Sequence, residues 1–137
     1  MTTVEQHSGI DQPTVGPVCW TPVCEADTVR PDRGIAVLVG NEPVAVFRLS
    51  AFDGGAEEWR AVSHLDPVAG VPVMARGLVG TIGEPPLVIP TVASPLHKER
   101  FNLRSGHSLD DSSASLQTFP VRVHEGRVEV GAPVTPT

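Results

Sequence analysis

The chain has 137 residues, a formal net charge of -6 and a sequence pI of about 5.2. This length suits one domain, and a domain of this size can bury a core without the metal or disulfide that shorter chains need. The acidic balance, with Lys98 as the single lysine, leaves no basic stripe for phosphates and argues against nucleic acid as a partner.

The chain begins with a polar segment, residues 1–17, which we predict to be a flexible N-terminal extension of a domain at residues 18–130. It has no apolar core of the kind found in signal peptides, and no later run approaches the roughly 18 apolar residues of a membrane span. We therefore expect a cytoplasmic protein. In that reducing compartment Cys19 and Cys24 are expected to stay free thiols.

Short apolar runs separated by glycine and proline follow, and they predict strands rather than helices. Only residues 25–29 favour a single helical turn. The run at residues 35–49 predicts a hairpin that turns at Gly40 and Asn41, and its Pro43 indicates an edge strand. Further strands are predicted at residues 59–62, 87–89, 91–93 and 101–103.

The last predicted element is a second hairpin. In FPVRVHEGRVEV, residues 119–130, valines alternate with polar residues on both sides of Glu125 and Gly126. The remaining residues, 131–137, contain nothing that could pack cooperatively, and we predict a flexible C-terminal tail. With 14 prolines and 13 glycines the chain suits short strands joined by shaped loops, so the predicted fold class is an all-β sandwich.

A long apolar loop is predicted at residues 66–95, and a loop of this length in a compact domain is usually functional. The motif SHLDPV at residues 63–68 begins it, and ASPLHKERFNL at residues 93–103 ends it. In order and spacing these motifs resemble the two ligand boxes of Rieske proteins. One family box has Cys, one residue and His; the other has Cys, two residues and His, followed by Gly.

The resemblance implies an antiparallel Rieske-like β-sandwich with two former cluster-binding loops, because the ligand residues themselves have changed. Asp66 and Val68 stand in the first box, and Ser94 and His97 stand in the second. A Rieske cluster needs two thiolates and two imidazoles, and only His97 supplies one of these groups. We therefore predict a chain without its own iron–sulfur cluster, without a bound metal and without a catalytic residue.

Several motifs lie in an order that narrows the resemblance. They are the opening residues 18–20, DP at 66–67, RGLVG at 76–80, GEP at 83–85, ASPLHK at 93–98 and the hairpin at 119–130. Together they resemble the small-subunit family of assimilatory NAD(P)H nitrite reductases. This resemblance implies an accessory subunit, not catalytic by itself, that docks on a large subunit reducing nitrite to ammonium in nitrate assimilation. FAD, an iron–sulfur cluster and sirohaem are then expected in that partner.

Other hypotheses remain open for the two boxes. One is a Rieske-type, ferredoxin-like electron carrier, which would contain iron and acid-labile sulfide. Another is a mononuclear metal protein, since His64, Asp66 and His97 would supply two imidazoles and a carboxylate, a set that binds non-haem iron. A third is a free-standing binding module for a small ligand.

Three basic residues are predicted to dock the partner. Arg76 is the strongest interface candidate in the long loop, because arginine buries a planar group with several donors at interfaces. Lys98 and Arg100 lie in the second box, and we interpret them as a docking patch.

Overall fold

The computed structural model describes residues 18–51, 56–110 and 113–133, and this part of the chain is mostly β-structure. Its 3-10 helices are η1 (Ala26–Thr28) and η2 (Met74–Arg76). Its strands are β1 (Val18–Glu25), β2 (Arg33–Val39), β3 (Glu42–Leu49), β4 (Glu58–Ser63), β5 (Leu78–Ile82), β6 (Ile89–Ala93), β7 (Arg100–Asn102), β8 (Thr118–Phe119), β9 (Val121–His124) and β10 (Arg127–Pro133). Within these ranges no helix is long and apolar enough to cross a membrane.

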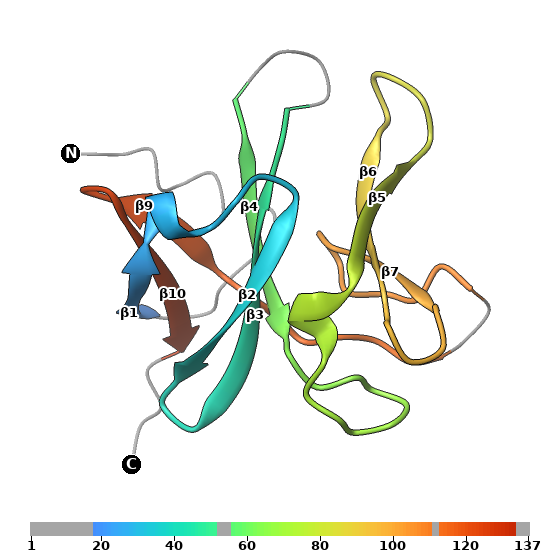
Figure 1. Cartoon of the computed structure of the whole chain (residues 1–137), viewed down its shortest axis with the longest axis horizontal. Helices are drawn as coiled ribbons and strands as arrows, with labels where there is room; N and C mark the ends of the chain where they lie inside the picture. The colour runs from blue at the N-terminus through green and yellow to red at the C-terminus, as the bar shows by residue number, and fades with distance from the viewer. Residues whose placement is uncertain (1–17, 52–55, 111–112, 134–137) are drawn as a thin grey trace.

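The described strands pair antiparallel in three small sheets, with the orders β1-β10-β9, β2-β3-β4-β8 and β5-β6-β7. Figure 1 shows the sheets in a row, with the sheet that contains β1 on the left and the sheet that contains β5 on the right. The predicted all-β fold class is confirmed.

The central sheet is covered on both faces, as strand β3 illustrates. Val44 and Val46 belong to a buried cluster shared with β9 and β10, whereas Ala45, Phe47 and Leu49 belong to a second cluster shared with β6 and β7. Successive side chains of a strand point to opposite faces of a sheet. The uninterrupted apolar run of β3 therefore fills two cores at once.

Both predicted hairpins are confirmed. β2 and β3 turn at Gly40 and Asn41, with a φ of 63° at Gly40. β9 and β10 turn at Glu125 and Gly126, with φ of 54° and 78°. The single helical turn predicted at residues 25–29 is confirmed as η1.

Pro43 does not mark an edge strand. That prediction is wrong because β3 pairs with β2 on one side and with β4 on the other. The proline is tolerated because it precedes the first β3–β4 pair, Val44 with Ser63, so its missing N–H breaks no bond to β4. Its carbonyl accepts the His64 amide at 3.0 Å.

The predicted loop at residues 66–95 is not irregular throughout, so that prediction is wrong in part. It contains η2, β5 and β6, and the two strands pair as a hairpin. The strand predicted at residues 87–89 is wrong for residues 87 and 88, and Ile89 instead begins β6, which continues through Pro90 and the strand predicted at residues 91–93. Local pattern missed β5 because Gly80 interrupts its apolar run and Pro90 interrupts that of its partner.

β10 continues beyond residue 130, the predicted end of the domain. Residues 131–133 pair with residues 18–20 of β1, so the tail prediction is wrong for these positions. They gain a partner strand from the opposite end of the chain, which no local pattern reveals. The predicted flexible segment 1–17 and the last residues, 134–137, lie outside the described ranges.

Candidate functional site

Two loops meet at one end of the molecule, at the lower right of Figure 1. The first loop, residues 65–72, follows β4 and is closed by a bridge between Leu65 and Pro72. The second loop, residues 94–99, connects β6 to β7, and the Ser94 amide donates to the Glu99 carbonyl at 2.9 Å. The loops extend from different sheets and are joined through side chains.

Asp66 is the centre of this junction, and it is 0% exposed. Within the first loop its Oδ1 accepts hydrogen bonds from the Val68 and Ala69 amides at 2.8 and 2.9 Å. From the second loop the Ser94 hydroxyl donates to Oδ2 at 2.5 Å. His97 Nε2 lies 3.1 Å from Oδ1 and 3.0 Å from Oδ2. One carboxylate thus contacts both loops.

These donors keep the Asp66 carboxyl group ionised. Burial by itself raises its pKa, but the hydrogen bonds from Ser94, the Ala69 and Val68 amides and His97 outweigh burial and lower the pKa to about 2. At neutral pH the group is therefore a buried anion. A buried charge is stable only when it is paired or hydrogen-bonded, and here donors from both loops meet that condition.

Ser94 and His97 both contact the Asp66 carboxylate, but they differ in their exposure to solvent. Ser94 is 1% exposed, and its Oγ also accepts the Leu96 amide at 3.2 Å, which extends the network into the turn of the second loop. The His97 side chain keeps 33% of its surface exposed. His97 therefore forms the solvent edge of the network, and Ser94 forms its interior.

His64 does not join this group. Its Nδ1 accepts the Ala75 amide of η2 at 3.1 Å. Burial and the nearby charge of Arg76 lower the pKa of His64, so the ring is neutral and remains an acceptor at neutral pH. In the described part of the chain no three His, Cys, Asp or Glu side chains come together as metal ligands. The structure therefore does not bring His64, Asp66 and His97 together as a triad, and the mononuclear metal protein stays a prediction.

The two loops expose several apolar side chains beside the charged Lys98. Val68 is 58% exposed, Val71 is 41% exposed and Leu96 is 50% exposed, and we call these three side chains the loop tip. Val68, one of the four positions that match the family's ligand boxes, thus lies at the surface, whereas Asp66 and Ser94 are buried. The junction thus combines a charged interior with exposed apolar side chains.

The three predicted docking residues have different surroundings. Lys98 is exposed on the second loop with a φ of 62°, a left-handed conformation that costs a non-glycine residue about 1 kcal/mol or more. Arg100 is held by Asp110, whose Oδ1 lies 2.9 Å from Nη2. Arg76 is exposed at the end of η2. Of the three, Lys98 is the one placed on the two loops themselves.

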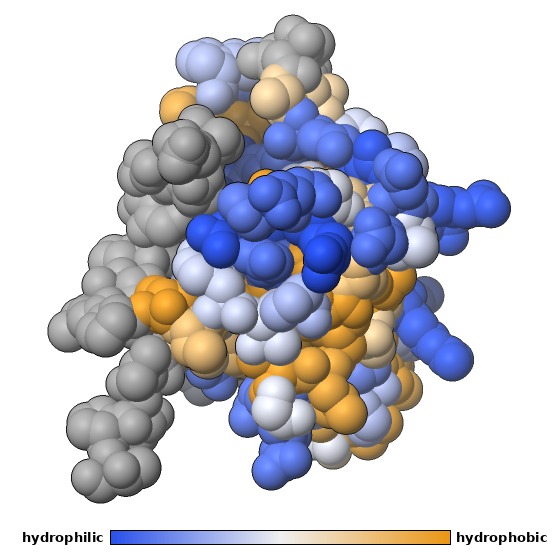
Figure 2. Space-filling model, turned by 90° about the vertical axis from the view of Figure 1, so that its left-hand side faces the viewer, coloured by the Kyte–Doolittle hydropathy of each residue, from blue (hydrophilic) through white to orange (hydrophobic). Residues whose placement is uncertain are grey.

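The sheet at the other side of the molecule presents a more charged face. Figure 2 shows that hydrophilic side chains cover the upper part of this face and that hydrophobic ones gather below them. Arg122 Nε lies 2.7 Å from Glu129 Oε1 across β9 and β10, and the Arg122 guanidinium lies 4.3 Å from the centroid of the Trp20 ring. These charges are engaged within their own sheet.

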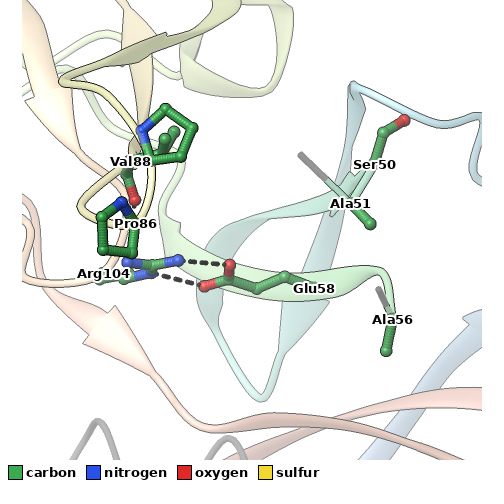
Figure 3. A pocket seen from close by; sticks show the side chains of 8 residues that line it. Ser50, Ala51, Ala56, Glu58, Pro86, Val88 and Arg104 are labelled. Atoms are coloured by element: carbon green, nitrogen blue, oxygen red, sulfur yellow. Dashed lines mark hydrogen bonds and ion pairs between the residues drawn. The ribbon is translucent and has the colours of Figure 1, made fainter. Parts of the chain in front are cut away.

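A pocket of ≈ 190 Å³ lies at the opposite end of β4 from the first loop (Figure 3). Its wall contains an ion pair that the sequence analysis missed, in which Arg104 Nε and Nη2 each donate to Glu58 at 2.9 Å. The partners are 46 residues apart and belong to no motif. Because the charges of Arg104 and Glu58 are paired with each other, neither is set aside to bind a charged ligand in the pocket. The lining residues are Ser50, Ala51, Ala56, Glu58, Pro85, Pro86, Val88 and Arg104.

The three sheets and the paired loops define a Rieske-type β domain, and the family model of the Rieske-like [2Fe-2S] domain matches residues 19–131. The small subunit of the NADH nitrite reductase of Escherichia coli K12 is 35% identical over 112 residues, which cover 81% of this chain and 95% of that subunit. A solved Mycobacterium tuberculosis structure, assigned as an NADH-dependent nitrite reductase small subunit, is 38% identical with a TM-score of 0.75 and covers 87% of this chain and 99% of its own. The chain belongs to the Rieske-like family of nitrite reductase small subunits.

A similar domain also occurs within a longer protein. The large subunit of the NAD(P)H nitrite reductase of Klebsiella oxytoca is 33% identical over 112 residues, which cover 82% of this chain. The chain spans 11% of the length of that relative. In Klebsiella oxytoca, a domain similar to this chain is therefore part of a large-subunit polypeptide.

The donors at the loop positions do not fit a [2Fe-2S] cluster. Thiolates are the ligands that select and hold iron–sulfur clusters, and the positions that match the family's cysteines are Asp66 and Ser94. These two side chains form a hydrogen bond with each other, so they already join the two loops. Val68 offers no lone pair. Of the four positions, only His97 carries a donor that the cluster uses.

Proposed function

We propose that this chain is the accessory small subunit of an NAD(P)H-dependent nitrite reductase that reduces nitrite to ammonium in nitrate assimilation. The match along 95% of the Escherichia coli small subunit carries this proposal. The chain is not catalytic by itself, and it docks on a large catalytic subunit in the cytoplasm.

The redox cofactors of the complex belong to the large subunit in this proposal. FAD, an iron–sulfur cluster and sirohaem are held there, and this chain holds no cluster of its own. The carboxylate and hydroxyl at Asp66 and Ser94 support that division, because they replace the thiolates a cluster would need.

The loop tip is the proposed contact surface, with Lys98 at its side. Exposed apolar side chains that lie together on a surface are typical of interfaces. The backbone of the loop tip is also held in place, because the Val68 amide donates to Asp66 Oδ1 and the Leu96 amide donates to Ser94 Oγ. Backbone strain such as that at Lys98 is concentrated at functional sites, which also favours this surface.

The Klebsiella oxytoca relative supports the choice of partner. Its large subunit contains a domain similar to this chain within one polypeptide. A domain joined covalently to a large subunit is held close to it at a high effective concentration. We infer that the separate chain forms the same association through surface contacts.

Co-expression with the large subunit tests the proposal. We expect the two chains to co-purify and NADH-dependent nitrite reduction to fall when this chain is left out. Unchanged activity together with no co-purification would refute the proposed function. Iron and acid-labile sulfide analysis of the separate chain tests the electron-carrier alternative, which requires both elements; we expect neither.

Substitutions on the surface test the proposed contact. Val68→Asp and Leu96→Asp each place a charge on the loop tip, and we expect either change to weaken binding to the large subunit by at least about tenfold. Leu38→Asp is the matched control, because Leu38 is 66% exposed but lies on β2 of the central sheet. Equal weakening by all three variants would exclude the loop tip as the specific contact.

A further inference from the structure

The two loops need a physical link, because each extends from a different sheet. In a protein that keeps the Rieske ligands, the cluster is bound by both boxes and so joins the loops. Here we infer that the buried Asp66 carboxylate takes over this structural task and holds the two loops in one fixed shape. The inference rests on the proposed absence of a cluster, and it makes Asp66 a positioning residue for the loop tip.

The first part of the argument is the turn of the first loop. Asp66 Oδ1 accepts the Val68 and Ala69 amides, and the Asp66 carbonyl accepts the Gly70 amide at 2.7 Å. The Asp66 amide in turn donates to the Val71 carbonyl at 2.8 Å. Side chain and main chain of this one residue therefore fix the backbone that carries Val68 and Val71.

The second part is the contact across the loops. Ser94 and His97, which donate to the same carboxylate, are 28 and 31 residues further along the chain. Because Ser94 Oγ also accepts the Leu96 amide, the network continues from Asp66 to the turn of the second loop. Both exposed turns, at Val68 and at Leu96, are thus tied to one buried group.

The chemistry of the carboxylate suits this task. An ionised carboxylate accepts several hydrogen bonds at once, and such charge-assisted bonds are stronger than neutral ones. An asparagine keeps one acceptor oxygen for the Val68 and Ala69 amides, but its amide nitrogen cannot accept the proton of the Ser94 hydroxyl. Replacing the carboxylate by an amide therefore keeps the size of Asp66 and weakens the link to the second loop, because the charge-assisted bonds are lost.

Amide hydrogen exchange of the full-length chain tests the inference without the partner. In Asp66→Asn and in Ser94→Ala we expect the Val68, Ala69 and Leu96 amides to exchange on the order of ten- to a hundredfold faster. Amides of β3 should exchange faster only as far as the loss of global stability in the same variant requires, and a larger acceleration at the loop amides separates opening of the loops from general destabilisation. Ser94→Ala removes a single hydroxyl, so it provides the answer even if Asp66→Asn fails to fold.

The matched control is a second aspartate–serine pair at the surface. Asp32 accepts the Ser50 amide and hydroxyl at 2.9 and 2.8 Å. Asp32→Asn and Ser50→Ala should leave exchange in the two loops unchanged. Wild-type exchange rates at Val68 and Leu96 in both Asp66→Asn and Ser94→Ala would overturn the inference.

Binding to the large subunit gives a second readout. Asp66 is fully buried and cannot touch a partner, so a purely local role predicts no effect on binding. We expect Asp66→Asn to weaken binding at least about fivefold through the loosened loop tip. Wild-type affinity in Asp66→Asn would overturn its positioning role. Failure of the wild-type chain to bind, or iron and sulfide in it, would instead contradict the proposed function, and the exchange data distinguish these cases.

Discussion

Two aspartate–serine pairs tie segments of this domain together, and they occupy opposite environments. The Asp32–Ser50 pair lies at the surface and joins the turn before β2 to the end of β3. The Asp66–Ser94 pair is buried and carries two further amides and a histidine on the same carboxylate. Water can replace a lost contact at the first pair and has no access to the second. The comparison teaches that burial, more than residue type, decides how much such a pair contributes.

Removing each aspartate is the strongest way to break this comparison. Asp66→Ala is expected to lower the free energy of unfolding by about 3–5 kcal/mol, because buried donors lose their charged acceptor. Asp32→Ala is expected to cost less than about 1 kcal/mol, since water can take over its hydrogen bonds. Urea denaturation of both variants measures the difference. Equal losses would show that burial is not what separates the two pairs.

Lowering the pH should also distinguish Asp66 from Asp32, with the second-largest expected effect. The folded state lowers the pKa of Asp66 from 3.8 to about 2, so in this range the unfolded chain binds more protons. The stabilisation is therefore fully present above a pH of about 3.8 and is lost as the pH falls toward 2. We expect Asp66→Asn to flatten this part of the plot of Tm against pH and Asp32→Asn to leave it in place. A parallel profile for Asp66→Asn would contradict the assignment.

The serines provide a milder form of the same test. Ser94→Ala is expected to lower the free energy of unfolding by about 1–2 kcal/mol, because one buried hydrogen bond to a charged group is lost. Ser50→Ala should cost about 0.5 kcal/mol or less, since its hydroxyl is replaced by water. Thermal or urea unfolding resolves these values when all variants are compared in one buffer. A larger loss for Ser50→Ala than for Ser94→Ala would reverse the ranking.

The smallest expected effect concerns backbone strain at two residues, one in the second loop and one in the turn between β9 and β10. Lys98 and Glu125 both have positive φ, at 62° and 54°. Glycine at either position should raise the free energy of unfolding by about 0.5 kcal/mol. The relief of left-handed strain exceeds this value, but it is partly offset by the greater freedom of glycine in the unfolded chain. If Asp66 holds the second loop in shape, the gain from Lys98→Gly disappears in an Asp66→Ala background, whereas the gain from Glu125→Gly persists. A double-mutant cycle measures this coupling.

The hairpins could be predicted from sequence because their signals are local. Alternating valines on each side of Glu125 and Gly126 specify both the strands and the turn within one short segment. The strand β5 was missed because Gly80 and Pro90 interrupt the apolar runs of its hairpin, and the end of β10 was missed because its partner strand, β1, lies at the opposite end of the chain. Pro43 was misread for the same reason, since its tolerance depends on where β4 begins to pair.

The candidate site was predicted only in part. Family spacing singled out Asp66, Ser94 and His97, and the structure brings these three together. Spacing also suggested His64, which instead accepts an amide of η2. Which way a loop side chain points depends on the packing of the loop, so a one-dimensional pattern could not separate His64 from the other three.

The sequence by itself determined the all-β class, the two hairpins and the change of donor chemistry at the loop positions, because these depend on residue type and on near neighbours. Only the tertiary structure decided that Asp66 and Ser94, 28 residues apart, share a buried hydrogen bond and that the apolar side chains of the loop tip face solvent. The physical reason is that burial and long-range pairing are properties of the packed sheets. No single segment of the chain contains them.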